Sequence, residues 1–111
     1  MPAPSPVRLV FSTCPDPASA DAIAQALVGE RLAACVSRWP GLRSSYRWQG
    51  AVESADEVQL LIKTTADRLD ALLARLVELH PYELPEAIAV EAHGGLPRYL
   101  DWVAEQTRDD D

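Results

Sequence analysis

The segment from His80 to Glu86 (HPYELPE) crowds one imidazole, one phenol and two carboxylates around two prolines. Proline fixes its own φ and disfavours helical backbone in the residue before it, so these groups are held stiffly. Polar groups held in this way are typical of a ligand-binding site. A structural alternative exists: His80 ends a predicted helix, where a cation is favoured, and the prolines stop that helix. Considered alone, the segment favours the structural alternative.

Cysteine and histidine side chains are the ligands that copper and zinc prefer. The chain has two of each, Cys14, Cys35, His80 and His93, and their spacing is not that of a zinc finger. Cys35 lies in the apolar run 32–36, so we expect it to be buried and inert, whereas Cys14 ends a strand and should be the more accessible thiol. Because there is no CxxC motif, we expect two reduced thiols in a cytoplasmic protein and no disulfide.

The sequence offers little for catalysis. Neither cysteine lies in a nucleophile motif, and the five glycines are too scattered to form a phosphate-binding loop. Glu83 and Glu86 are three residues apart, but the prolines around them argue against a helical carboxylate pair. We therefore expect no enzymatic activity.

The composition excludes two classes of partner. The chain has 111 residues and a net charge of −7, so it lacks the basic surface that nucleic acids require. No apolar run approaches the ~20 residues of a membrane span. We expect one domain over residues 7–107, preceded by a flexible lead-in at 1–6 and followed by an acidic tail at 108–111.

The periodicity of apolar residues predicts the order β-α-β-β-α-β, followed by a short C-terminal helix. The strands are expected at 7–13, at 34–37 with a continuation at 44–48 after a break at Pro40-Gly41, at 51–64 and at 87–93; the helices are expected at 17–31, at 66–79 and from Pro97. The inward helical stripes are Ala20, Ile23, Ala24, Leu27 and Val28, then Leu69, Leu72, Leu73, Leu76 and Val77. Gln49-Gly50 is a plausible two-residue hairpin turn, and Thr65 a cap for the second helix. The fold class is α+β, a ferredoxin-like sandwich with a long hairpin between its second and third strands.

Two helices can cover only one face of such a sheet, and the other face should be polar if it meets water. We expect Val10, Leu61, Ala87 and Ala89 on that second face, which makes it partly apolar. The long hairpin also presents the aromatic rings of Tyr46 and Trp48 beyond a compact core. Both features favour a homo-oligomer in which other subunits cover these surfaces.

Several motifs together resemble the CutA family of divalent-cation tolerance proteins. The matching segments are TCPD at 13–16, LAACV at 32–36, PG at 40–41, SYRWQG at 45–50, the stretch from Glu57 to KTT at 63–65, HPY at 80–82 with PE at 85–86, and YLDW at 99–102. They span nearly the whole chain in the family's order. The resemblance implies a ferredoxin-like homotrimer, similar in plan to the PII signalling proteins, and a link to tolerance of copper and other divalent ions.

The copper site implied by the resemblance uses a cysteine near the end of the first strand and two histidines before Pro-Tyr. Ser12 stands at the cysteine position, and Cys14 lies two residues along on the same face, about 7 Å away. Leu79 stands at the first histidine position, so only His80 remains. The resemblance thus implies moderate affinity for Cu(II) or another divalent cation, with His80 and Cys14 as ligands.

Two other functions stay open. One is a PII-like module that binds a small anionic or zwitterionic metabolite in a cleft between subunits, lined by Trp48, Glu57, Lys63, Tyr82 and Glu86. For Lys63 the structural alternative is an ion pair with Glu57 or Glu86. The other function is an assembly scaffold without a ligand. The sequence does not identify the physiological ion or ligand.

Overall fold

A computed structural model describes residues 5–109 of the chain. Its elements are β1 (Val7–Cys14), α1 (Pro17–Gly29), β2 (Cys35–Trp48), β3 (Ala51–Thr65), the 3-10 turn η1 (Ala66–Arg68), α2 (Leu69–Leu79), β4 (Ile88–Glu91) and α3 (Pro97–Gln106). Most of the predicted lead-in, residues 1–4, and the end of the predicted tail, residues 110–111, lie outside the described residues. The predicted order of elements is confirmed.

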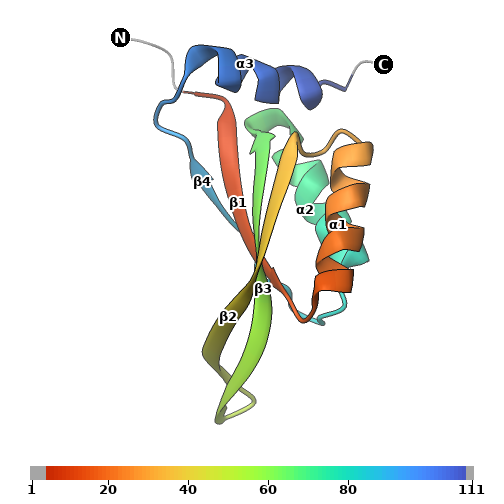
Figure 1. Cartoon of the computed structure of the whole chain (residues 1–111), viewed down its shortest axis with the longest axis vertical. Coiled ribbons are helices and arrows are strands. Elements are labelled where there is room, and N and C mark those ends of the chain that lie inside the picture. Colours follow the sequence, from red (N-terminus) through yellow and green to blue (C-terminus); the bar gives the residue numbers. More distant parts are fainter. Residues whose placement is uncertain (1–4, 110–111) are drawn as a thin grey trace.

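The four strands form one antiparallel sheet in the order β2-β3-β1-β4. Each βαβ unit therefore leaves room for a strand of the other unit, which confirms the ferredoxin-like α+β class. Helices α1 and α2 lie on one side of the sheet, while α3 lies across the end where β1 begins (Figure 1). Beyond the helices, β2 and β3 continue together as a projecting hairpin (Figure 1).

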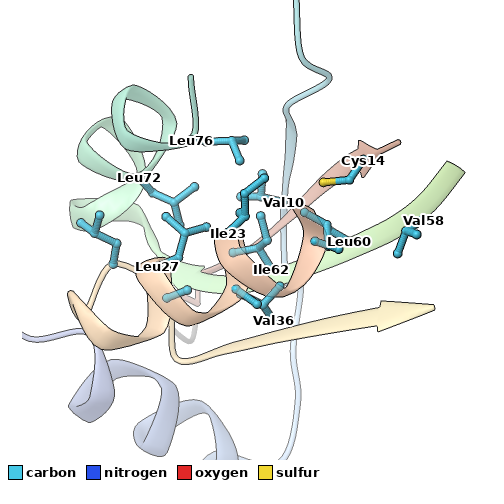
Figure 2. Packing of buried hydrophobic residues seen from close by; sticks show 14 residues of the cluster. Val10, Cys14, Ile23, Leu27, Val36, Val58, Leu60, Ile62, Leu72 and Leu76 are labelled. Atoms are coloured by element: carbon cyan, nitrogen blue, oxygen red, sulfur yellow. The ribbon is translucent and has the colours of Figure 1, made fainter. Parts of the chain in front are cut away.

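The main core lies between the sheet and the pair α1 and α2 (Figure 2). The strands contribute side chains from alternate positions, and the helices contribute theirs at helical spacing. The fully buried larger members are Val10, Ile23, Leu27, Leu60, Ile62, Leu72 and Leu76. The predicted stripes were too wide, because Val28 and Val77 are 42% and 58% exposed at the edge of each helix.

The sheet face away from α1 and α2 is partly apolar, but of its four predicted members only Leu61 lies on it, since Ala87 precedes β4. Val10 is completely buried and pairs with Ala89, so both residues belong to the helix-covered face. The register places Leu9, Phe11, Leu61, Ile88 and Val90 on the open face. The alternation in β1 favours the face of Val7, Leu9 and Phe11, because the face of Val10 also carries Arg8 and Ser12, yet Val10 meets the helices. Ile88 remains 58% exposed, so one chain leaves this face uncovered.

The hairpin is one pair of long strands and not the interrupted strand expected at Pro40-Gly41. A register shift between Trp39 and Leu42 absorbs these two residues as a bulge, where Gly41 has φ +91°. The predicted turn is confirmed, since Gln49 and Gly50 both have positive φ, as a type I′ turn requires.

The ends of the helices differ in detail from the prediction. Thr65 holds the N-cap position, but its hydroxyl donates to the Asp67 carboxylate at 2.6 Å and not to a helix N–H, and the helix starts with the 3-10 turn. The fourth strand is also shorter than the predicted 87–93. At the C-terminus, Val103 of α3 packs against Val7, which fixes α3 to the sheet.

Candidate functional site

Cys14 and His80 meet at the end of the sheet nearest the hairpin. Cys14 is the last residue of β1, and His80 is the C-cap of α2, with extended backbone at φ −81° and ψ 138°. The Cys14 Sγ and His80 Nε2 atoms are 3.8 Å apart, although 66 residues separate them in sequence. The structure therefore brings together the two residues predicted as metal ligands.

The predicted accessibility of the two thiols was wrong. Cys14 is completely buried at one end of the main core (Figure 2). Cys35 is half-buried. Cys14 shares its strand face with Val10, so its side chain enters the helix-covered layer. Both thiols are free, as expected.

The imidazole of His80 is only 8% exposed and uses both of its nitrogens. Nε2 lies 2.7 Å from the Thr13 carbonyl oxygen, which can only accept, so Nε2 carries the proton and donates. Nδ1 accepts from the backbone N–H of Tyr82 at 3.0 Å. These contacts define a neutral imidazole, and a metal ion must replace one of them to reach a nitrogen lone pair.

The Cys14 thiol is neutral near pH 7. Burial raises its pKa from the ordinary 9.0 to about 11, and the negative charges of Asp16 and Glu57 add to this shift. A thiolate is the form that binds metal, so a cation must displace the thiol proton.

Tyr82 and Glu57 form the next layer of the site. The Tyr82 hydroxyl donates to Glu57 Oε2 at 2.7 Å, and the Tyr82 ring packs against the His80 ring with centroids 4.8 Å apart. Glu57 is 8% exposed. Burial first, and then the hydrogen bond to Glu57, raise the pKa of Tyr82, so the phenol stays a neutral donor.

An open cleft of about 940 Å³ lies between the hairpin and the segment that links α2 to β4. Its lining comprises Thr13, Ser44, Ser45, Tyr46, Arg47, Trp48, Glu53, Glu57, Tyr82, Glu83, Leu84, Pro85, Glu86, Ala87 and Ile88. Four of the five predicted cleft residues are among these. Lys63 is not: its ammonium lies 3.3 Å from the Tyr99 hydroxyl beside α3. Among the described residues Lys63 has no ion pair with Glu57 or Glu86, so the structural alternative is not seen within one chain.

The sequence reasoning did not assign the other lining residues to the cleft, and Glu53 is an example. Glu53 pairs directly with Tyr46 across the hairpin, so their side chains share one face. The two-residue turn at Gln49-Gly50 already implied this register and could have identified the pair. The backbone carbonyl of Thr13, which holds His80, left no signal in the sequence.

Cys14 and His80 provide two metal donors and no complete metal site. Within residues 5–109, no group of three or more His, Cys, Asp or Glu side chains could hold a metal ion. A bound cation would need water or a second chain for its remaining ligands. The same residues include no helix long and apolar enough to cross a membrane.

Comparison with known proteins shows matches over nearly the whole chain. The family model for the CutA1 divalent ion tolerance protein matches residues 8–106. The divalent-cation tolerance protein CutA of Thermus thermophilus is 48% identical over 100 residues, which cover 90% of this chain and 97% of that protein.

Two solved structures extend this result. The crystal structure of CutA from Xylella fastidiosa superposes with a TM-score of 0.92 at 56% identity, covering 94% of this chain and all of that one. A protein named as the periplasmic divalent cation tolerance protein CutA from Archaeoglobus fulgidus has a TM-score of 0.89 at 29% identity, covering 92% and 99%.

Proposed function

The chain belongs to the CutA1 divalent ion tolerance protein family, and we propose that it is a homotrimeric divalent-cation tolerance protein that binds Cu(II) through Cys14 and His80. One observation carries the proposal: the 3.8 Å approach of the Cys14 sulfur and the His80 imidazole. The proposal includes no catalytic step.

The chemistry of these donors favours copper. Thiolate and imidazole suit copper and zinc, and the Irving–Williams order places Cu(II) above the other divalent ions. The affinity should be moderate, because binding must displace the thiol proton and one hydrogen bond of His80. Two donors also leave coordination positions open for water or for a neighbouring subunit.

The uncovered face of the sheet supports the homotrimer. Leu9, Phe11, Leu61, Ile88 and Val90 lie together on this face, and Ile88 and Val90 are exposed in one chain. An apolar surface of this kind is typical of a subunit interface. Sedimentation equilibrium at micromolar concentration should give three times the mass of one chain, and a monomer would contradict the trimer.

We also expect the protein to work in the cytoplasm, where two unpaired thiols remain reduced. The name of the Archaeoglobus fulgidus relative places that protein in the periplasm. Fractionation of the native cells, with thiol labelling of each fraction, tests the expectation. Recovery of the protein from the periplasm would contradict it.

Calorimetric titration of metal-free protein with Cu(II) tests the metal site. We expect His80→Gln to bind at least tenfold more weakly than the wild type, because it removes the imidazole ligand. Cys14→Ser should also weaken binding, since a hydroxyl is a poor ligand for copper. Equal affinity in the wild type and His80→Gln would contradict the assignment.

His93→Gln is the matched control, because it removes the other histidine of the chain. His93 is exposed and does not line the cleft. This variant should retain the affinity of the wild type. A loss of Cu(II) binding in His93→Gln, with no loss in His80→Gln, would instead identify His93 as the metal ligand.

A second candidate function is binding of a small metabolite, as in a PII-like module. The cleft of about 940 Å³ favours it, because small-molecule sites usually occupy a concave surface of similar size. Trp48, Tyr82, Glu57 and Glu86 lie in its lining. A thermal-shift screen of charged metabolites tests this function, and the absence of any stabilising compound would favour a scaffold without a ligand.

A further inference from the structure

We propose that the backbone N–H of Tyr82 couples metal binding at His80 to the conformation of the segment 80–86. The inference rests on the copper site proposed above and goes beyond it, because it assigns a structural response to binding. The observation that carries it is the use of both imidazole nitrogens of His80 in hydrogen bonds within the chain.

The His80 ring donates one hydrogen bond and accepts the other. Nε2 donates to the Thr13 carbonyl oxygen at 2.7 Å, and Nδ1 accepts from the Tyr82 N–H at 3.0 Å. A neutral imidazole carries one proton, so one nitrogen is a donor and the other is an acceptor. Only the tautomer with the proton on Nε2 satisfies both contacts.

The Tyr82 N–H loses its acceptor when His80 becomes a metal ligand through Nε2. This nitrogen lies 3.8 Å from the Cys14 sulfur, so it is the one that can share a metal ion with the thiolate. His80 offers a lone pair there only after Nε2 releases its proton and Nδ1 takes one up, which keeps the imidazole neutral. The new Nδ1–H then faces the Tyr82 N–H, and two donors cannot bond to each other.

Coordination through Nδ1 has the same consequence for Tyr82. That nitrogen is the acceptor of the Tyr82 N–H, so its lone pair cannot serve a metal ion and the hydrogen bond together. Whichever nitrogen becomes the ligand, the Tyr82 N–H must therefore leave the ring.

The segment that carries Tyr82 has few other restraints. Between residues 81 and 86 the described chain forms no backbone–backbone hydrogen bond. Besides its N–H, Tyr82 is held by its ring, 4.8 Å from that of His80, and by its hydroxyl, which donates to Glu57 at 2.7 Å. An unpaired N–H in this part-buried place costs free energy unless the peptide turns toward water. We therefore expect the segment to rearrange when His80 becomes a ligand.

Hydrogen exchange of the full chain, with and without Cu(II), measures this response by mass spectrometry of the peptide 80–86. The Tyr82 amide should exchange at least tenfold faster in the Cu(II)-loaded protein, whereas the β3 peptide that contains Ile62 should not exchange faster. Binding to the native state ordinarily slows exchange, so the opposite sign in one segment identifies the rearrangement. Unchanged or slower exchange of the peptide 80–86 in Cu(II)-loaded protein would overturn the proposal.

Two variants of Tyr82 isolate the N–H. Tyr82→Pro and Tyr82→Ala both remove the ring and the hydroxyl, but only proline lacks the donor. Calorimetry should show Tyr82→Pro binding Cu(II) about fivefold more tightly than Tyr82→Ala, because no hydrogen bond to Nδ1 has to be broken. Equal affinities would overturn the proposal. The exchange measurement on the wild type provides the test even where Tyr82→Pro does not fold.

Tyr82→Phe separates the N–H from the phenol. It keeps the N–H and the ring and removes the hydrogen bond to Glu57. This variant should retain the faster exchange of the peptide 80–86 on Cu(II) binding. Loss of the response in Tyr82→Phe would assign the coupling to the phenol and overturn the proposal.

His80→Gln distinguishes failure of this inference from failure of the copper site. Cu(II) binding that needs His80 but leaves the exchange of the peptide 80–86 unchanged would overturn the inference alone. Cu(II) binding that persists in His80→Gln, or no Cu(II) binding in the wild type, would overturn the copper site and this inference with it.

Discussion

Ile62 and Leu61 are neighbours on β3, yet their side chains enter opposite faces of the sheet with different surroundings. Ile62 is completely buried in the core that α1 and α2 complete. Leu61 lies on the open face, where Ile88 remains exposed. A single chain therefore buries the helix-covered face, whereas it leaves the open face and the adjoining cleft exposed. The candidate cleft adjoins this open face, whereas the candidate metal donors Cys14 and His80 are buried at one end of the helix-covered core.

The largest expected effect is on the free energy of unfolding, and it should differ between the two faces of the sheet. Ile62→Ala should lower the free energy of unfolding by about 2–5 kcal/mol, because it leaves a cavity in a closed core. The variant should keep the oligomeric mass of the wild type. Denaturant unfolding and sedimentation equilibrium measure the two quantities.

Leu61→Asp is the matched change on the open face. A carboxylate there cannot be buried against another subunit without a large desolvation cost, so the oligomer should dissociate into folded monomers. Circular dichroism should show that the secondary structure is retained. A Leu61→Asp protein with unchanged mass would contradict the difference between the faces.

The second effect concerns Cys14, where the core meets the candidate site. Its pKa is about 11 in the folded chain against an ordinary 9.0, so between these values the folded state binds the thiol proton more strongly than the unfolded state. This stabilisation is complete below pH 9 and is lost as the pH rises through 11. The free energy of unfolding should fall by up to about 3 kcal/mol across this range.

Cys14→Ser isolates the contribution of the thiol, because serine does not ionise in this range. Other groups titrate equally in both proteins, so the difference in slope between wild type and variant reports Cys14 alone. Unfolding by urea at pH 8, 9, 10 and 11 provides the measurement. Parallel curves for the two proteins would show that the thiol is not buried.

The smallest effect lies at the tip of the hairpin. Gly50 has φ +82° and no neighbouring atom within 4 Å of an added Cβ, so Gly50→Ala should cost about 1 kcal/mol through backbone conformation alone. Gly94→Ala is the control, because Gly94 has equal space and no positive φ, and it should be neutral or slightly stabilising. Equal stability of the two variants in thermal unfolding would contradict the type I′ turn.

Local patterns in the sequence predicted most of the fold. Helical spacing located α1 and α2, and the Gln49-Gly50 pair located the hairpin turn. The patterns failed where the orientation of a strand face depended on pairing with residues distant in the sequence. The pattern of β1 favours Val7, Leu9 and Phe11 as the core face, but the register with β3 and β4 places Val10 on the face that meets the helices.

The candidate site was predictable only in part. The resemblance to CutA pointed to Cys14 and His80, which lie together in the structure. The burial of Cys14 could not be predicted, because it depends on a packing layer built by helices elsewhere in the chain. The backbone carbonyl of Thr13 and the N–H of Tyr82, which hold the imidazole, are present in every peptide unit and therefore leave no pattern.

Electron paramagnetic resonance of the Cu(II)-loaded protein tests the central claim most directly, because it reports the ligand atoms of the metal. In a His93→Gln background the remaining imidazole is His80. We predict nitrogen coupling from one imidazole per chain, and its loss when His80→Gln is added. A spectrum that His80→Gln leaves unchanged would contradict the assignment of this site as the copper centre.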